Sequence, residues 1–106
     1  MAAYKIISVA ESAQLISQQH PVILDCRDVN AYKAGHINNA MHLHEQLRES
    51  LLRKADKQQP ILIYCYHGHA SEHVAEMFSD FGFKQVYSMA GGYTLWSQQP
   101  NPTGDL

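Results

Sequence analysis

The sequence predicts a small α/β domain with a mostly parallel central sheet that is flanked by helices on both faces. Short apolar segments alternate along the chain with segments of helical periodicity, as in repeated strand–helix–strand units. Two of the apolar segments are continuous, which is typical of strands that are buried on both faces. The length of 106 residues fits a single domain over residues 1–106, with a tail from about residue 99 that is expected to fray.

The first predicted strand leads directly into the first predicted helix. Residues 5–9 are expected to form the strand, and Ser8 with Glu11 matches a capping box that opens a helix. Helical spacing continues to about Gln19. Pro21 then ends the helix, because proline cannot supply the amide that a helix interior requires.

The next elements follow the same alternation. Residues 22–26 are predicted to form the second strand. Asp28 is placed to cap a short helical turn that ends at Gly35. Apolar residues at helical spacing then predict a further helix over residues 45–55.

The second half of the chain contains the most apolar strand and the clearest helix. The strand is predicted over residues 61–65 and the helix over residues 71–81. The apolar positions of this helix are Val74, Met77, Phe78 and Phe81. Residues 85–88 form another short predicted strand, and a Gly91-Gly92 turn separates it from a last helix over residues 93–98.

Composition excludes several classes of partner. The net charge of -2 reflects 8 Lys and Arg against 10 Asp and Glu, and the basic residues are scattered, so no nucleic-acid surface is expected. No apolar run approaches the roughly 20 residues that span a bilayer, and no signal peptide is visible, so no membrane association is expected. Two cysteines are too few for a disulfide scaffold, which favours a cytoplasmic protein with reduced thiols.

The segment from Cys65 to Ser71 has the strongest chemical signal. Cys65 ends the most apolar strand, a short loop with Gly68 follows, and a helix begins at once. Strand ends of this kind carry ligand sites, and helix N-termini favour anions, so the setting lowers the pKa of a thiol and makes it nucleophilic. A buried core cysteine is the competing interpretation, and these features alone leave both open.

Three segments, in order along the chain, resemble the signatures of the single-domain rhodaneses. Residues 24–28 (LDCRD) and 34–37 (AGHI) resemble the first signature. Residues 65–71 (CYHGHAS) resemble the active-site loop, and residues 86–93 (VYSMAGGY) with Trp96 resemble the last signature. None of these segments is specific by itself, but the ordered set covers most of the chain.

The resemblance implies a thiosulfate sulfurtransferase that needs no cofactor. It implies that the Cys65 thiolate takes the outer sulfur of thiosulfate as a persulfide. The acceptor is then a thiophile, either cyanide or a dithiol protein such as thioredoxin. The residues implied to bind substrate are Tyr66, His67, Gly68, His69, Ala70 and Ser71. The alternative is a persulfide carrier or a binding module of the same fold that serves a protein partner; a homodimer is the default expectation for a small enzyme.

Two other chemistries use similar residues. Cysteine-dependent phosphatases bind phosphate through an arginine six residues after the cysteine. Ser71 occupies that position here, so phosphatase activity is not expected. No metal site is expected either, because the side chains of a curled loop point outward and do not converge on an ion. Surface positions are expected for His20, His42, His44 and His73.

Asp25 and Arg27, at the end of the second strand, have two alternative roles. They either position the Cys65 loop from behind or form an ion pair that holds the first crossover, and the second role is favoured because buried arginines usually serve carboxylates. Cys26 is interpreted as a thiol of the core or of the surroundings of the site. A disulfide with Cys65 under oxidation stays open to it if their Cα atoms lie within about 7 Å.

Three aromatic residues near the C-terminal end of the chain are expected to pack in the core. The alternative is that they form an aromatic wall beside the mouth of the site. They are Tyr87, Tyr93 and Trp96. His36, within the first signature, is expected to have a structural role.

Overall fold

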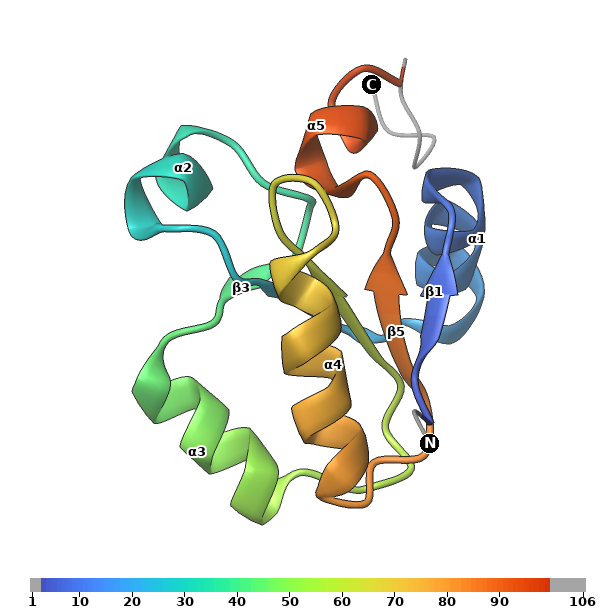
Figure 1. Ribbon diagram of the computed structural model, residues 1–106, viewed down its shortest axis with the longest axis vertical. Helices are drawn as coiled ribbons and strands as arrows, with labels where there is room; N and C mark the ends of the chain where they lie inside the picture. Colours follow the sequence, from blue (N-terminus) through green and yellow to red (C-terminus); the bar gives the residue numbers. More distant parts are fainter. Residues whose placement is uncertain (1–2, 100–106) are drawn as a thin grey trace.

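The computed structural model describes residues 3–99, and strands and helices alternate along them (Figure 1). The elements are β1 (Lys5–Ile7), α1 (Val9–Gln19), β2 (Val22–Asp25), α2 (Val29–Ala34), β3 (Met41–His42), α3 (Glu45–Lys54), β4 (Ile61–Tyr64), α4 (Ala70–Asp80), β5 (Val86–Met89) and α5 (Gly92–Trp96). No helix among these residues is long and apolar enough to cross a membrane. The predicted frayed tail falls mainly on residues 100–106, which lie outside the described residues.

The strands form one parallel sheet in the order β1-β5-β4-β2-β3, which confirms the predicted fold class. β4 lies in the middle, and all four of its residues are buried, which explains its continuous apolar run. β2 pairs with β4 so that Asp25 lies beside Tyr64 at their carboxyl ends. The residues that follow these two strands therefore start side by side.

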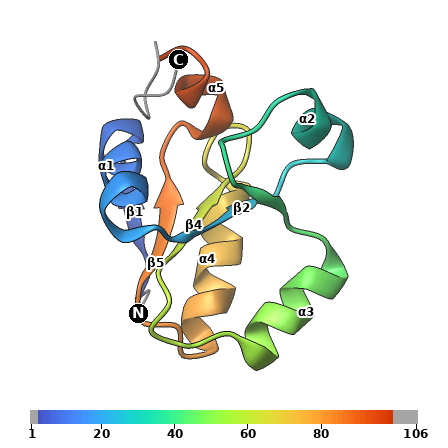
Figure 2. The same cartoon turned by 180° about the vertical axis from the view of Figure 1, so that it is seen from behind.

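Helices cover both faces of the sheet. α3 and α4 lie on one face, and α1 lies on the other (Figures 1 and 2). Neighbouring residues of β4 point into opposite cores, as the two-residue period of a strand requires: Leu62 packs with Val9 and Trp96, whereas Ile63 packs with Ala75 and Phe78. The predicted two-sided burial of the sheet is thus confirmed.

The predicted capping box at the start of α1 is confirmed. The Ser8 Oγ accepts from the Glu11 amide at 3.0 Å, and the Glu11 Oε1 accepts from the Ser8 amide at 2.8 Å. The strand predicted over residues 5–9 ends earlier, at Ile7. The predicted strand was two residues too long, because Ser8 already serves as the helix cap and Val9 is the first helical residue.

Side-chain caps also open the next two helices. The Asp28 Oδ1 accepts from the Ala31 amide at 3.0 Å, and α2 ends before Gly35, as predicted. At the start of α3, the exposed His44 accepts from the Leu47 amide through Nδ1 at 3.3 Å. These caps begin the two helices of the long connection between β2 and β4.

Some elements differ from the predictions. β3, over Met41–His42, was missed because two residues give no apolar run; it pairs with the edge of β2. The helix predicted over residues 71–81 is α4, one residue earlier at each end. Phe81, assigned to its apolar face, is 55% exposed, and Phe83 packs against Phe78 in the core instead.

Candidate active site

Cys65 directly follows β4, at the carboxyl end of the sheet, where the loop to α4 begins (Figure 1). Cys65 is only 4% exposed, and it lines a pocket at the surface. The next residues turn back over it, and the buried Gly68 makes the turn with φ +102°, a left-handed conformation that glycine adopts without strain. The predicted order of strand, loop and helix is therefore present at Cys65.

Two backbone amides and one hydroxyl surround the sulfur of Cys65. The Gly68 amide lies 3.2 Å from the Sγ and the Ser71 amide 3.3 Å from it, and both donate to it. The Ser71 Oγ lies 3.4 Å away; the thiol donates to this oxygen, and the hydroxyl can donate back once the sulfur is a thiolate. Preorganised donors of this kind stabilise negative charge without a cationic side chain.

These surroundings lower the pKa of Cys65 to about 4, far below that of an ordinary thiol. The largest cause is the neighbouring Cys26 thiol; the Ser71 hydroxyl and amide and the Gly68 amide add to it, and burial opposes them. The Cys26 thiol also lies 3.2 Å from the Tyr64 carbonyl oxygen, so its single proton can serve either that oxygen or the Cys65 sulfur. This lowered pKa favours the thiolate form of Cys65 at neutral pH.

Alkylation of Cys65 by iodoacetamide is expected to proceed at a constant rate between about pH 6 and 8. The rate should fall only in acid, with a midpoint at about pH 4, because the lowered pKa leaves the thiolate fully formed above that range. An ordinary thiol, with a pKa of about 8.5, would instead gain reactivity throughout. Mass spectrometry of the labelled chain measures the rate. The Cys65→Ser variant measures alkylation of Cys26 alone, which is then subtracted. A steady rise from pH 6 to 8 would contradict the lowered pKa.

A second buried hydroxyl supports Ser71. The Ser71 Oγ lies 2.8 Å from the Ser88 Oγ of β5, and both serines are fully buried. Ser71 can therefore accept from Ser88 while it donates to the thiolate of Cys65. Sequence reasoning missed Ser88, although a hydroxyl in an otherwise apolar, buried strand was a signal for it.

α5 fixes the backbone of the loop from outside. The Tyr93 amide donates to the Cys65 carbonyl at 2.8 Å, and the Thr94 amide donates to the Tyr66 carbonyl at 3.1 Å. The free amides of a helix N-terminus thus hold the loop in place. Gly92 permits this close approach, since a Cβ there would lie 2.4 Å from the Tyr66 carbonyl oxygen and 2.5 Å from that of Cys65. The sequence indicated only a turn here and missed this contact.

The remaining predicted substrate-binding residues have exposed side chains around the mouth of the site. Tyr66, His67, His69 and Ala70 line, with Cys65, a pocket of about 180 Å³. The Tyr66 hydroxyl donates to the Asp28 carboxylate, which lowers the pKa of that carboxyl and ties the loop to the start of α2. Within residues 3–99, no group of three or more metal-ligating side chains could hold an ion.

Asp25 and Arg27 form a buried ion pair behind the site. The Arg27 Nη2 lies 2.7 Å from Asp25 Oδ2, and the Arg27 Nε lies 3.0 Å from Oδ1. Arg27 also donates to the Gly35 carbonyl at 2.6 Å, and its guanidinium lies over the Tyr93 ring at 4.1 Å. The pair therefore joins β2, the end of α2 and α5, which supports the interpretation that it holds the crossover.

The surface prediction is wrong for one histidine. His42 is half-buried, and its Nε2 lies 2.8 Å from the Arg27 carbonyl, because the unpredicted β3 brings it beside the end of β2. His20, His44 and His73 are exposed, as expected. His36 stacks on Tyr32, which agrees with a structural role.

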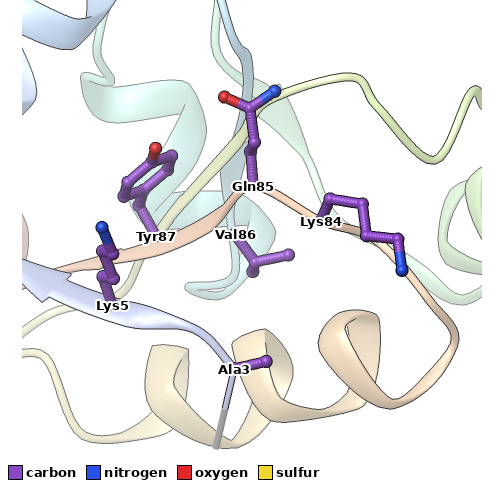
Figure 3. Close-up of a pocket in the computed structure, with 6 residues that line it drawn as sticks. All are labelled: Ala3, Lys5, Lys84, Gln85, Val86 and Tyr87. Carbon is purple, nitrogen blue, oxygen red and sulfur yellow. The ribbon is translucent and has the colours of Figure 1, made fainter.

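The aromatic residues do not form one wall. Trp96 is buried in the core, whereas Tyr93 packs under Arg27 beside the loop. Tyr87 lines a different pocket of about 250 Å³ at the edge formed by β1 and β5, near the amino end of β5 (Figure 3). That pocket contains Lys5 and Lys84 but no cysteine, and it lies away from Cys65.

The fold and the cysteine loop define a known class of domain. The sequence profile described as "Rhodanese-like domain" matches residues 8–99, and the chain belongs to that family. A protein of Coxiella burnetii (strain RSA 331 / Henzerling II) named "Thiosulfate sulfurtransferase GlpE" is 43% identical over 96% of this chain and 94% of its own length. One of the same name from Pseudomonas entomophila (strain L48) is 40% identical over 97% and 94%.

Solved structures agree with the fold. The crystal structure of a rhodanese-like domain protein from Staphylococcus aureus has a TM-score of 0.72 and 27% identity, and the match covers 87% of this chain and 90% of that one. The resemblance to single-domain rhodaneses that the three sequence segments indicated is therefore confirmed.

Proposed function

We propose that this chain is a thiosulfate sulfurtransferase that carries the transferred sulfur as a persulfide on Cys65. The observation that supports this best is the convergence of two backbone amides and the Ser71 hydroxyl on the sulfur of Cys65. The names of relatives about 40% identical over nearly the whole chain support thiosulfate as the donor. The pocket at the loop leaves room for a small anion above the sulfur.

The reaction proceeds in two displacements at sulfur. The Cys65 thiolate attacks the outer sulfur of thiosulfate, the sulfur–sulfur bond of thiosulfate breaks, and sulfite leaves with the bonding electrons. The negative charge of the resulting persulfide lies on the outer sulfur, where the amides of residues 66–71 stabilise it. A thiophile then attacks that outer sulfur, and the Cys65 thiolate departs into the hydrogen bonds that held it before.

The proposal also covers the sulfur acceptor, the cellular compartment and the oligomeric state. Cyanide serves as a test acceptor, and a dithiol protein such as thioredoxin is the class that the exposed mouth of the pocket would admit. Both cysteines are free thiols, which suits a reducing cytoplasm. Homodimer formation stays a prediction, and light scattering of the purified chain would check it.

Mass spectrometry of the intact protein tests the proposal. Immediately after mixing with thiosulfate, the chain is expected to gain one sulfur atom and to release sulfite, and cyanide is expected to remove the sulfur as thiocyanate. The Cys65→Ser variant should do neither. If thiosulfate adds no sulfur but a protein-bound persulfide does, the chain is a persulfide carrier. If neither donor adds sulfur, the binding-module alternative is favoured.

The KM for thiosulfate is expected to be high, in the millimolar range. Residues 66–71 include no Lys or Arg, and the Arg27 guanidinium is already bonded to Asp25 and to the Gly35 carbonyl. Neutral donors bind anions more weakly than charged ones. Steady-state kinetics with cyanide measure the KM, and Ala70→Arg at the pocket is expected to lower it. A micromolar KM in the unmodified enzyme would contradict this prediction.

A further inference from the structure

The second cysteine lies beside the first. Cys26 follows β2 directly, Cys65 follows β4 directly, and the preceding residues Asp25 and Tyr64 are register partners. The Cys26 amide continues the ladder by donating to the Tyr64 carbonyl at 2.9 Å. Adjacent strands are about 4.8 Å apart. This spacing lies within the Cα separation of about 4.4–6.8 Å that disulfides require.

The two thiols are held in different states. The Cys26 thiol is half-buried and donates to the Tyr64 carbonyl at 3.2 Å. Its pKa is raised, first by the neighbouring Cys65 and then by burial, so Cys26 keeps its proton while Cys65 is a thiolate. Only Cys65 is therefore ready to attack thiosulfate. Cys26 stays protonated beside it, on the strand side of the sulfur.

Formation of the persulfide changes this relation. The negative charge moves one atom outward, to the outer sulfur within the loop. The inner sulfur of Cys65 becomes half of a sulfur–sulfur bond, which is the kind of atom that a thiolate attacks in disulfide exchange. The anionic outer sulfur accepts the Cys26 proton, which makes Cys26 the attacking thiolate. Gly68 and Ser71 reach Cys65 from the loop, whereas Cys26 reaches it from the neighbouring strand. Cys26 thus has access to the inner sulfur while the loop holds the outer one.

We propose that Cys26 is a second reacting thiol, which resolves the Cys65 persulfide to a Cys26–Cys65 disulfide and releases hydrosulfide. The inference rests on the proposed function. A bond forms between the two cysteine sulfurs, the bond between the Cys65 sulfur and the outer sulfur breaks, and the Cys26 proton goes to the outer sulfur. The outer sulfur is reduced to hydrosulfide, and the two thiols are oxidised to the disulfide. A soluble dithiol then reduces the disulfide, so that the chain turns over as a dithiol-dependent thiosulfate reductase.

The test compares the wild type with Cys26→Ser, which keeps a donor for the Tyr64 carbonyl. Each protein is loaded with thiosulfate, freed of excess reagent, and left without acceptor or reductant. The wild type is expected to lose the added sulfur, to end with the mass of the chain less two hydrogens, and to release about one hydrosulfide per chain. Cys26→Ser is expected to keep the added sulfur until cyanide removes it. Circular dichroism confirms folding, and Cys26→Ala serves if the serine variant is unfolded.

The outcomes separate the two proposals. If Cys26→Ser gains a sulfur that cyanide removes while the wild type also keeps its persulfide, the inference is wrong and the sulfurtransferase proposal stands. Equal release of hydrosulfide from both proteins also overturns the inference, since Cys26 would not be the resolving thiol. If neither protein gains sulfur from thiosulfate, the proposed function fails, and the inference fails with it.

Discussion

Replacing Gly92 by alanine is expected to lower sulfur transfer by about 100-fold, because it displaces the loop that surrounds Cys65. The added Cβ would lie 2.4 Å from the Tyr66 carbonyl oxygen and 2.5 Å from that of Cys65, and both are backbone atoms. The loop or α5 must therefore move, and the amide bonds of α5 to these two carbonyls lengthen or break. The left-handed conformation of Gly92, with φ +57°, adds strain for any residue with a side chain.

The free energy of unfolding of Gly92→Ala should fall by about 2–5 kcal/mol, from left-handed strain and from a forced shift in a packed site. Gly82→Ala is the matched control. Gly82 also has a positive φ, +98°, but a Cβ there meets nothing within 4 Å. We expect the control to lose about 1 kcal/mol and no activity. Urea unfolding and thiocyanate formation measure the two effects, and equal activity of the two variants would contradict the role of α5.

Replacing Asp25 by leucine is expected to cost about 3–5 kcal/mol of stability, because Arg27 would remain buried without its carboxylate. Asp25 is fully buried, and Arg27 is only 7% exposed. The double variant Asp25→Leu/Arg27→Met should lose less, since no unpaired charge remains in the interior. Urea unfolding of the single and double variants measures the difference.

The same variants separate the two roles considered for the pair. If the pair only holds the crossover, the double variant should alkylate Cys65 at the wild-type rate under conditions in which it is folded. If the pair positions the loop, that rate should fall although the protein is folded. A single variant that loses less than about 1 kcal/mol would contradict the buried ion pair as a stabilising contact.

Local signals in the sequence were sufficient to predict every element except β3, and to predict Cys65 as the nucleophile. Ser8 with Glu11 and Asp28 satisfy nearby amides of their own helices, so their roles could be predicted from spacing within one turn. Cys65 lies between a continuous apolar strand and a helix N-terminus, all within a dozen residues. The two residues of β3 gave no such signal, because their strand forms only by pairing with β2.

Sequence patterns alone predicted the parallel α/β fold, the alternation of its strands and helices, and Cys65 as the reactive cysteine, because each depends on periodicity or on neighbours in the chain. Only the tertiary structure decided what surrounds that cysteine. Ser88 reaches Ser71, α5 holds the carbonyls of the loop, and Cys26 stands beside Cys65. These contacts join residues 17 to 39 positions apart, as Ser71 and Ser88 or Cys26 and Cys65 show. Strand register and helix packing create them, and neither can be predicted from a local sequence pattern.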